Sequence, residues 1–417
     1  MMRITGVNKN FDVTVDLVGS KSESNRALMI GYYGGFTPRI NNLSKSDDTV
    51  LLSEIIDKIN VNTRFIASHQ SINGETIIDC ANAGTVLRFL ATALAFHDGD
   101  FILTGSNRML QRPIGDLVNA LRSMGANIEY LGNEGFPPLK IHGKNIVETF
   151  PATSPIHVDI ARSSQFASSI LLALPVFQTF QKTSLLLEGD LSSLPYIDMT
   201  IDVMRKFGAD VHRDGRYIFV KPSEYQDVVY TVESDWTCAS YWYEIVAFSE
   251  NGRARLRNLR LDSKQGDAIV AKWFERFDVK SVQDGNDVVI TKSVEMFSET
   301  SQNINDKPLH FDFTNNPDLY PTIAATCAGL GIKGDFTGLQ NLKFKESDRV
   351  AAITMELANV ETNGRASLPI VFDSHDDHRI AMALAPLAMK ISDIEINNAD
   401  VVSKSYPNFW TEFFQLL

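Results

Sequence analysis

Apolar and polar residues along this chain of 417 residues repeat one supersecondary pattern six times. One copy begins with an apolar strand near residue 103, passes through a polar loop and enters a predicted helix over residues 114–124. The apolar positions of that helix recur at i, i+3, i+4 and i+7, which gives it one apolar face: Ile114, Leu117, Val118 and Leu121. Gly125 ends the helix and a strand follows at residue 128. Self-similarity over tens of residues signals stacked or duplicated structural units.

A second clear copy of the pattern has a strand at residues 185–187, a helix over 197–207 and a strand at 217–220. Weaker copies begin near residues 43, 256, 336 and 396. Six further helices of small or apolar residues lie between the copies, starting near Ser22, Gly84, Ser164, Cys238, Asp318 and His378. Two of them, at residues 85–96 and 166–176, are apolar nearly all round, so we expect them to be buried.

Each repeat therefore contains a helix, a strand, a second helix and two more strands. The six repeats cover about residues 20–79, 82–142, 163–220, 236–290, 316–372 and 377–417. The last repeat lacks its final two strands, and we expect two N-terminal strand-like runs, residues 2–7 and 11–17, to complete it. This predicts an α/β (α+β) protein with a first domain at residues 19–228 and a second at residues 1–18 and 229–417.

Composition limits the class of protein. The chain is 44% apolar and 22% charged, as in soluble globular proteins, and has no run of about 18 apolar residues that could span a membrane. Its first residues alternate like a strand and do not read as a signal peptide, which favours the cytoplasm. Three widely spaced cysteines indicate reduced thiols rather than a metal site. A net charge of −12 argues against nucleic acid, while basic residues in several loops favour a small anion.

Uncharged donors and cations occupy the loops before the helices of the first three repeats. Lys21, Ser22 and Arg26 surround the first helix start, where free backbone N–H groups can bind an anion. An ordinary Ser-rich helix cap explains that loop equally well. The later repeats carry similar residues at corresponding positions: Asn82, Gly84, Thr85, Arg88 and Arg112, then Ser163, Ser164, Gln165, Ser193 and Tyr196. Three loops in register indicate a shared polar face on the first domain.

Titratable residues gather in the loops of the fifth and sixth repeats. They are Asp318, Asn341, Lys345, Glu346, Asp348, Arg349, Asp376, Asp377, His378, Arg379 and Lys404. A run such as 345–349 is usually a solvated charged face, and a lone histidine such as His378 is usually structural. The recurrence of these groups at the same position in successive repeats favours a functional site.

These motifs resemble one family. GSKSESNRAL, NAGT, QRPIGDLV, SSQF, LPYID, PDLYPT, KESDR, DDHRIAM and Lys404 occur in the order found in 5-enolpyruvylshikimate-3-phosphate (EPSP) synthases. The resemblance extends from Gly19 to Lys404. It implies two similar domains of three βαβαββ units each, of the inside-out α/β barrel type, with the active site in the cleft between them. It also implies a cytoplasmic, monomeric enzyme of aromatic amino acid biosynthesis without metal or cofactor.

The resemblance assigns each candidate residue to a substrate. Shikimate 3-phosphate would be bound by Lys21, Ser22, Arg26, Ser163, Ser164, Gln165, Ser193, Asp318, Asn341 and Lys345. Phosphoenolpyruvate would be bound by Lys21, Gly84, Arg112, Gln165, Arg349, Arg379 and Lys404, with Asn82, Thr85, Tyr196 and His378 close by. Asp318 would act as the base, Glu346 as the acid and Lys21 as a further catalytic group. Two phosphates and two carboxylates in one site require such arginines and lysines.

Two departures from the family pattern bear on inhibition by glyphosate, which the resemblance also implies. Ala81 replaces a usual glycine, and Phe89 replaces a usual proline. Two other readings of the chain remain open at this point. A transferase acting on UDP-N-acetylglucosamine would commonly carry a cysteine in the loop at residues 106–112, which has none. A non-catalytic phosphosugar-binding protein would lose the acid–base pair, yet Asp318 and Glu346 are both present.

Overall fold

A computed structural model describes residues 1–62, 71–72, 75–144, 155–177, 183–293, 307–363 and 369–417. The chain divides into two compact units. Unit A contains residues 21–44 and 48–232, and unit B contains residues 1–20, 45–47 and 233–417. The predicted points at which the chain passes between the two domains, near Gly19 and Val228, lie a few residues before these changes, and the short segment 45–47 of unit B was not predicted.

Unit A is built around the apolar helices of the first three repeats. Its helices are α1 (Lys21–Gly34), α2 (Asp47–Asn62, whose first residue belongs to unit B), α3 (Gly84–Ala95), α4 (Gly115–Ser123), α5 (Gln165–Ala173) and α6 (Leu194–Lys206). Helices α1, α3 and α5 pack against one another. Every residue of α3 except Thr85 is buried, so the expected burial of residues 85–96 is confirmed.

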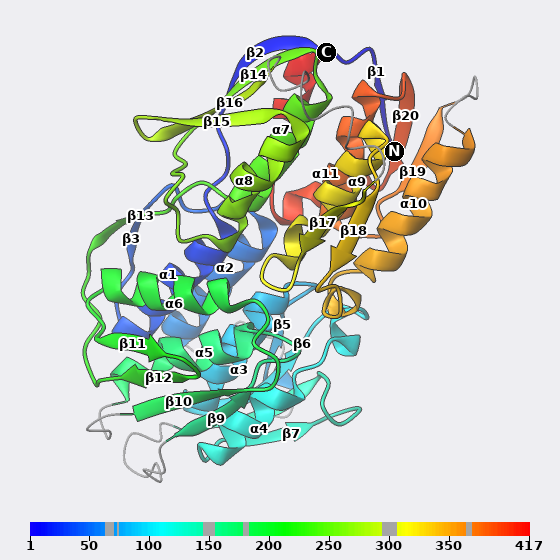
Figure 1. Cartoon of the computed structure of the whole chain (residues 1–417). Coiled ribbons are helices and arrows are strands. Elements are labelled where there is room, and N and C mark those ends of the chain that lie inside the picture. The colour runs from blue at the N-terminus through cyan, green and yellow to red at the C-terminus, as the bar shows by residue number, and fades with distance from the viewer. Residues whose placement is uncertain (63–70, 73–74, 145–154, 178–182, 294–306, 364–368) are drawn as a thin grey trace. The chain divides into compact units, whose positions relative to one another are not determined.

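Among the described residues, three sheets complete unit A, and they surround these helices in Figure 1. One has the order β4 (Ser71–Ile72), β5 (Glu75–Asp79), β6 (Gly99–Thr104), β8 (Leu139–Gly143), β7 (Asn127–Tyr130). Another has the order β11 (Val211–Asp214), β12 (Tyr217–Val220), β10 (Thr183–Glu188), β9 (Ile156–Asp159). The third pairs β3 (Arg39–Asn41) with β13 (Val229–Thr231). The helix predicted at residues 114–124 is confirmed as α4, and the one predicted at 197–207 begins earlier, at Leu194.

Unit B repeats this design. Its helices are α7 (Trp236–Phe248), α8 (Val270–Phe274), α9 (Tyr320–Leu330), α10 (Arg349–Asn363), α11 (His378–Leu384) and α12 (Phe409–Phe413). Helix α9 packs against both α7 and α11, and all three lie side by side in Figure 1. One sheet of unit B has the strand order β15 (Val279–Asp284), β16 (Asp287–Lys292), β14 (Asn251–Leu256), β2 (Asn10–Val15). Another has the order β1 (Met2–Thr5), β20 (Asp393–Asn397), β19 (Ile370–Asp373). A further sheet pairs β17 (Leu309–Asp312) with β18 (Gly334–Thr337).

The strands next to the two crossings are exchanged between repeats. Strand β2 precedes α1 of unit A, yet it pairs in parallel with β14 of unit B. Strand β13 precedes α7 of unit B, yet it pairs in parallel with β3 of unit A. The expectation that both N-terminal strands complete the sixth repeat is therefore wrong for β2, and of these two strands β1 is the one that pairs with β20. Alternating residues show that a segment is a strand, but they do not identify the neighbour to which it hydrogen-bonds.

No helix among the described residues is long and apolar enough to cross a membrane.

Candidate active site

Three cations of unit B converge on the carboxylate of Asp318. This residue lies in a short 3₁₀ helix (Pro317–Leu319) just before α9. Its Oδ1 accepts hydrogen bonds from Arg349 Nη1 at 2.6 Å and Lys345 Nζ at 3.2 Å. Its Oδ2 accepts one from Arg379 Nη2 at 2.8 Å. Residues that lie up to 61 positions apart in the sequence therefore meet on one carboxylate.

Arg349, the first residue of α10, connects Asp318 to two further carboxylates. Its Nη2 donates to Glu346 Oε2 at 2.8 Å, and its Nε donates to Asp377 Oδ2 at 2.8 Å. Only 1% of the Arg349 side chain is exposed. A guanidinium group offers five N–H donors in a fixed plane, which suits it to hold several carboxylates at set angles.

The remaining predicted residues of unit B lie around this network. Lys404 is the last residue of a 3₁₀ helix (Ala399–Lys404), and its Nζ lies 3.7 Å from Glu346 Oε1. His378, the first residue of α11, is buried, with its Nδ1 3.7 Å from Asp377 Oδ1. Asn341 immediately precedes the 3₁₀ helix Leu342–Phe344, after which Lys345 is extended. The run 345–349 is not a solvated charged face, because its functional side chains are largely buried.

Burial and charge together set the ionisation of this network. Burial raises the pKa of Asp318, but the attraction of Arg379, Lys345 and Arg349 outweighs it and leaves that pKa well below its ordinary value. Burial lowers the pKa of Lys345, although Asp318 opposes this shift. Nearby, burial and the charge of Asp318 raise the pKa of Asp267 to about 6. Asp318 therefore stays ionised to lower pH than Asp267 does.

A second group of predicted residues surrounds Gly84 at the start of α3 in unit A. Gln165 Nε2 donates to Thr85 Oγ1 at 2.9 Å, and Arg88 Nη1 donates to Gln165 Oε1 at 2.7 Å. Arg112 Nη1 donates to the carbonyl oxygen of Asn82 at 3.4 Å.

The two arginines leave no room for a side chain at Gly84. A Cβ atom there would lie 2.7 Å from both Arg88 Nη1 and Arg112 Nη2. A side chain at Gly84 would therefore force both guanidinium groups to shift. Two cations at a helix start form a suitable binding site for an anion, here named the anion seat.

Arg26 is enclosed within unit A and joins three helices. Its guanidinium group donates to Thr200 Oγ1 at 2.7 Å, to the carbonyl of Tyr196 at 3.0 Å and to that of Ser22 at 2.8 Å. It also lies over the ring of Phe89, 5.7 Å from the ring centroid. Burial lowers the pKa of Arg26 to about 10, and it stays charged at neutral pH. These bonds give Arg26 an evident structural role.

The three predicted phosphate-binding serines lie at the starts of two helices that pack together, α5 and α6. Ser163 Oγ accepts a hydrogen bond from the backbone N–H of Gln165 at 3.2 Å, and Ser164 is the residue before α5. Ser193 precedes α6 with a left-handed backbone, φ 60°. Lys21, the first residue of α1, lies with its Nζ 3.1 Å from Asp48 Oδ2. Helix starts with hydroxyl groups suit a phosphate dianion.

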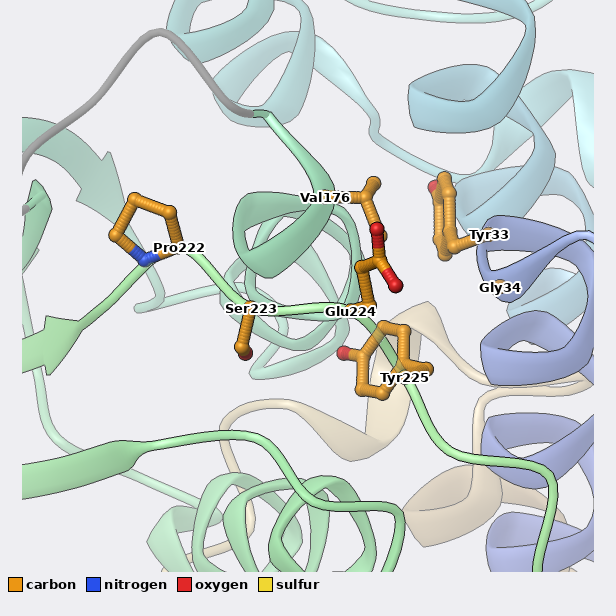
Figure 2. Close-up of a pocket in the computed structure, with 7 residues that line it drawn as sticks. All are labelled: Tyr33, Gly34, Val176, Pro222, Ser223, Glu224 and Tyr225. Carbon is orange, nitrogen blue, oxygen red and sulfur yellow. The ribbon is translucent and has the colours of Figure 1, made fainter.

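A pocket of about 490 Å³ in unit A contains none of the predicted residues. Figure 2 shows it between Tyr33, Val176 and the segment that carries Ser223, Glu224 and Tyr225. It adjoins the C-terminal end of α1, at Gly34, whereas Lys21 begins that helix, about 20 Å away at 1.5 Å per residue. The pocket is therefore separate from the residues that the motifs identified.

Two residues of these networks were noted in the sequence without an assigned substrate. Asp377 caps α11 and binds Arg349. Arg88, one helical turn after Gly84, binds Gln165. No sequence signal identified Thr200 or Asp267. In the described part of the chain, no three His, Cys, Asp or Glu residues are grouped to hold a metal ion.

Comparison with known proteins supports one family. The profile of the EPSP synthase family (3-phosphoshikimate 1-carboxyvinyltransferase) matches residues 7–413. A 3-phosphoshikimate 1-carboxyvinyltransferase of Bacteroides fragilis is 36% identical over 419 residues, which cover 96% of this chain and 94% of that protein. One of Vibrio cholerae is 34% identical over 430 residues, which cover 96% of each chain.

Solved structures support the fold. The EPSP synthase of Acinetobacter baumannii has a TM-score of 0.70 and 20% identity, covering 99% of this chain and 97% of that one. The enolpyruvyl transferase NikO of Streptomyces tendae has a TM-score of 0.69 and 14% identity, and the match covers 99% of this chain and 96% of that one. The mixed α/β fold and the family resemblance inferred from the sequence are thus confirmed. The chain belongs to the EPSP synthase family.

Proposed function

We propose that the two groups of residues described above carry out the reaction of the EPSP synthase family in this chain. That reaction transfers the carboxyvinyl group of phosphoenolpyruvate to the 5-hydroxyl of shikimate 3-phosphate and releases phosphate. The observation that carries the assignment of roles is the convergence of Arg349, Lys345 and Arg379 on the ionised Asp318. The relatives' names favour this substrate over UDP-N-acetylglucosamine.

Asp318 takes the proton of the attacking hydroxyl group in this proposal. Its low pKa keeps it ionised, which a base requires, but also makes it a weak base while its three cations are unshared. Phosphoenolpyruvate brings a phosphate and a carboxylate to Arg349 and Arg379. These anions offset part of the cations' attraction for Asp318, so substrate binding raises the basicity of Asp318 when it is needed.

Glu346 supplies the proton that the methylene carbon of phosphoenolpyruvate accepts. Its side chain is 8% exposed and lies between Arg349 and Lys404. In the addition step the substrate oxygen bonds to C2 as C3 gains the proton. In the elimination step C3 returns a proton to the Glu346 carboxylate, the C2–O bond to phosphate breaks and the double bond re-forms. Lys21 and the arginines stabilise the charge of the tetrahedral intermediate.

The anionic groups of the substrates are bound mainly by residues of unit A, and Asn341 and His378 of unit B are further contributors in this proposal. Ser163, Ser164 and Ser193 hold the phosphate of shikimate 3-phosphate, with Lys21, Ser22, Arg26 and Asn341 as further ligands. Gly84, Arg112 and Gln165 bind phosphoenolpyruvate, supported by Asn82, Thr85, Tyr196 and His378. Arg88 joins this group, because its guanidinium lies beside Gly84 and bonds to Gln165.

Phosphate release from phosphoenolpyruvate tests the proposed function directly. Release should require shikimate 3-phosphate, and UDP-N-acetylglucosamine should not replace it. Release that depends on UDP-N-acetylglucosamine would assign the chain to the rival transferase, and no release with either acceptor would favour a binding protein. A monomeric, cytoplasmic enzyme is part of the same proposal, and light scattering of the purified protein should give a mass near 46.4 kDa.

A further inference from the structure

The loop that joins β19 to α11 holds a backbone that its residues disfavour. His375 has φ 52° and Asp376 has φ 55°, so two successive residues other than glycine are left-handed. Each such residue costs free energy and persists only where its surroundings hold it. Asp377 follows directly and binds Arg349, so the shape of this loop determines where Arg349 and Arg379 point.

Glu356 of α10 holds the first half of the loop. Its Oε1 lies 2.7 Å from His375 Nε2, and its Oε2 accepts the backbone N–H of Asp373 at 3.1 Å. The Glu356 side chain is 5% exposed and that of His375 is 27% exposed, so solvent competes little for the bond. The backbone N–H of His375 also donates to Asp373 Oδ1 at 2.6 Å.

The same helix holds the second half of the loop. Arg349 and Glu356 are seven residues apart on α10, which places them two turns apart on one face. Arg349 Nε bonds to Asp377, and Ser347 Oγ donates to the same carboxylate at 3.1 Å. On the other side, Asn398 Nδ2 donates to Asp376 Oδ1 at 2.5 Å. Helix α10 thus contacts the loop at both ends of its left-handed pair.

We propose that the Glu356–His375 pair positions Arg349 and Arg379 for phosphoenolpyruvate by holding the strained β19–α11 loop against α10. Asp377 then lies where it can bind Arg349 and cap α11, and Arg379 at the start of that helix reaches Asp318. Neither Glu356 nor His375 touches the reacting groups, so both are positioning residues. The inference rests on the proposed function, since it assigns both arginines to phosphoenolpyruvate.

His375→Asn tests the proposal with little backbone cost, because asparagine tolerates the left-handed region but its side chain is too short to keep the bond to Glu356. The KM for phosphoenolpyruvate should rise about 5- to 20-fold, the loss expected from one charge-assisted hydrogen bond. The KM for shikimate 3-phosphate and kcat should change less than about two-fold. Glu356→Gln should raise the same KM, and the double variant should not add the two effects.

His310→Asn is the matched control. It removes another histidine–carboxylate pair of unit B, His310 with Asp335 at 2.9 Å, in which both side chains are more than half exposed. It should leave all three constants unchanged. An unchanged KM for phosphoenolpyruvate in both His375→Asn and Glu356→Gln would overturn the proposal, as would an equal rise in both KM values.

Hydrogen exchange gives a readout that does not depend on turnover. The backbone N–H of Arg379 donates to Asp377 at 3.0 Å, so a loosened loop should expose it. Peptides covering residues 373–380 should exchange faster in His375→Asn than in the parent and in His310→Asn. Equal exchange would overturn the proposal that the Glu356–His375 pair holds this loop against α10. If the parent protein had no turnover but the exchange difference were present, the proposed function would be wrong and the role of the Glu356–His375 pair in holding the loop would stand.

Discussion

Arg349 Nη1 lies 2.6 Å from Asp318 Oδ1, and the same guanidinium group binds Glu346 through Nη2. The proposed base and the proposed acid are therefore held by one almost fully buried side chain. Removing a partner from a buried ion pair leaves an uncompensated charge, so these residues depend on one another for stability as well as for chemistry. Variants that change charge but keep shape are the informative ones.

Asp318→Asn should lower kcat by roughly 10²- to 10⁴-fold, the usual contribution of a general base. The amide keeps the size of the side chain but cannot accept the hydroxyl proton. In the parent, the lowered pKa of Asp318 should place its acid limb in the pH profile of kcat/KM below the ordinary aspartate value of about 3.9. Phosphate release measured between pH 4 and 8 checks both statements. Near-normal turnover of the amide variant would contradict the assigned role.

Glu346→Gln should also lower kcat by roughly 10²- to 10⁴-fold, while both KM values change far less. Asp348→Asn is a matched control two residues away. Asp348 is exposed and accepts the backbone N–H of Ala351 at 3.2 Å, so its loss should leave kcat nearly unchanged. If both variants lost turnover equally, the effect would come from the start of α10 and not from proton transfer.

The sequence identified these groups better than it identified their partners. Lys345, Glu346 and Arg349 are neighbours in the sequence, and signals for a helix start placed them just before a helix. The bonds from Arg349 to Asp318 and Asp377 join residues 31 and 28 positions apart, respectively, and such pairing follows from tertiary packing alone. The pairing of β2 with β14 was missed for the same reason.

Replacing both Ser164 and Ser193 with alanine should weaken binding of shikimate 3-phosphate and leave binding of unphosphorylated shikimate nearly unchanged. Both serines lie at helix starts, and in the proposed function their hydroxyl groups donate to the phosphate and not to the shikimate ring. Calorimetric titration with each ligand measures the difference. Ser223→Ala, in the separate pocket, should alter neither affinity. Equal losses of affinity for both ligands would refute the proposal that Ser164 and Ser193 bind the phosphate group.

Glu244→Gln should remove a pH dependence of stability. Glu244 lies buried in α7, and within the described residues neither carboxylate oxygen has a hydrogen-bond partner. Burial holds its pKa well above the ordinary value. Above the unfolded pKa of about 4.3, the folded protein keeps a proton that the unfolded chain has lost, so stability falls by about 1.4 kcal/mol per pH unit until the folded pKa is reached.

Urea denaturation between pH 4.5 and 8 measures this effect. The free energy of unfolding of Glu244→Gln relative to the parent should increase as pH rises. Glu250→Gln, an exposed change just beyond the same helix, should leave the parent's pH dependence intact. Parallel curves for Glu244→Gln and the parent would mean that Glu244 has an ordinary pKa.

Glyphosate should inhibit the enzyme in competition with phosphoenolpyruvate, and Gly84→Ala should relieve that inhibition. The added Cβ would lie 2.7 Å from Arg88 Nη1 and Arg112 Nη2, so both guanidinium groups must move from the anion seat. Phosphoenolpyruvate uses the same seat, and its KM should therefore rise as well. Inhibition constants and KM values measured for parent and variant test both effects.

Phe89 is the residue that could oppose this sensitivity, since a bulky ring replaces the family's usual proline. Its ring is 1% exposed and lies beneath Arg26, one turn beyond Gly84 on α3. Close-packed interiors transmit shifts, so the ring could tilt the helix start, but Gly84 itself borders both arginines. We therefore expect the glycine to dominate. A resistant parent whose sensitivity is restored by Phe89→Pro would show that the ring beneath Arg26 controls the anion seat instead.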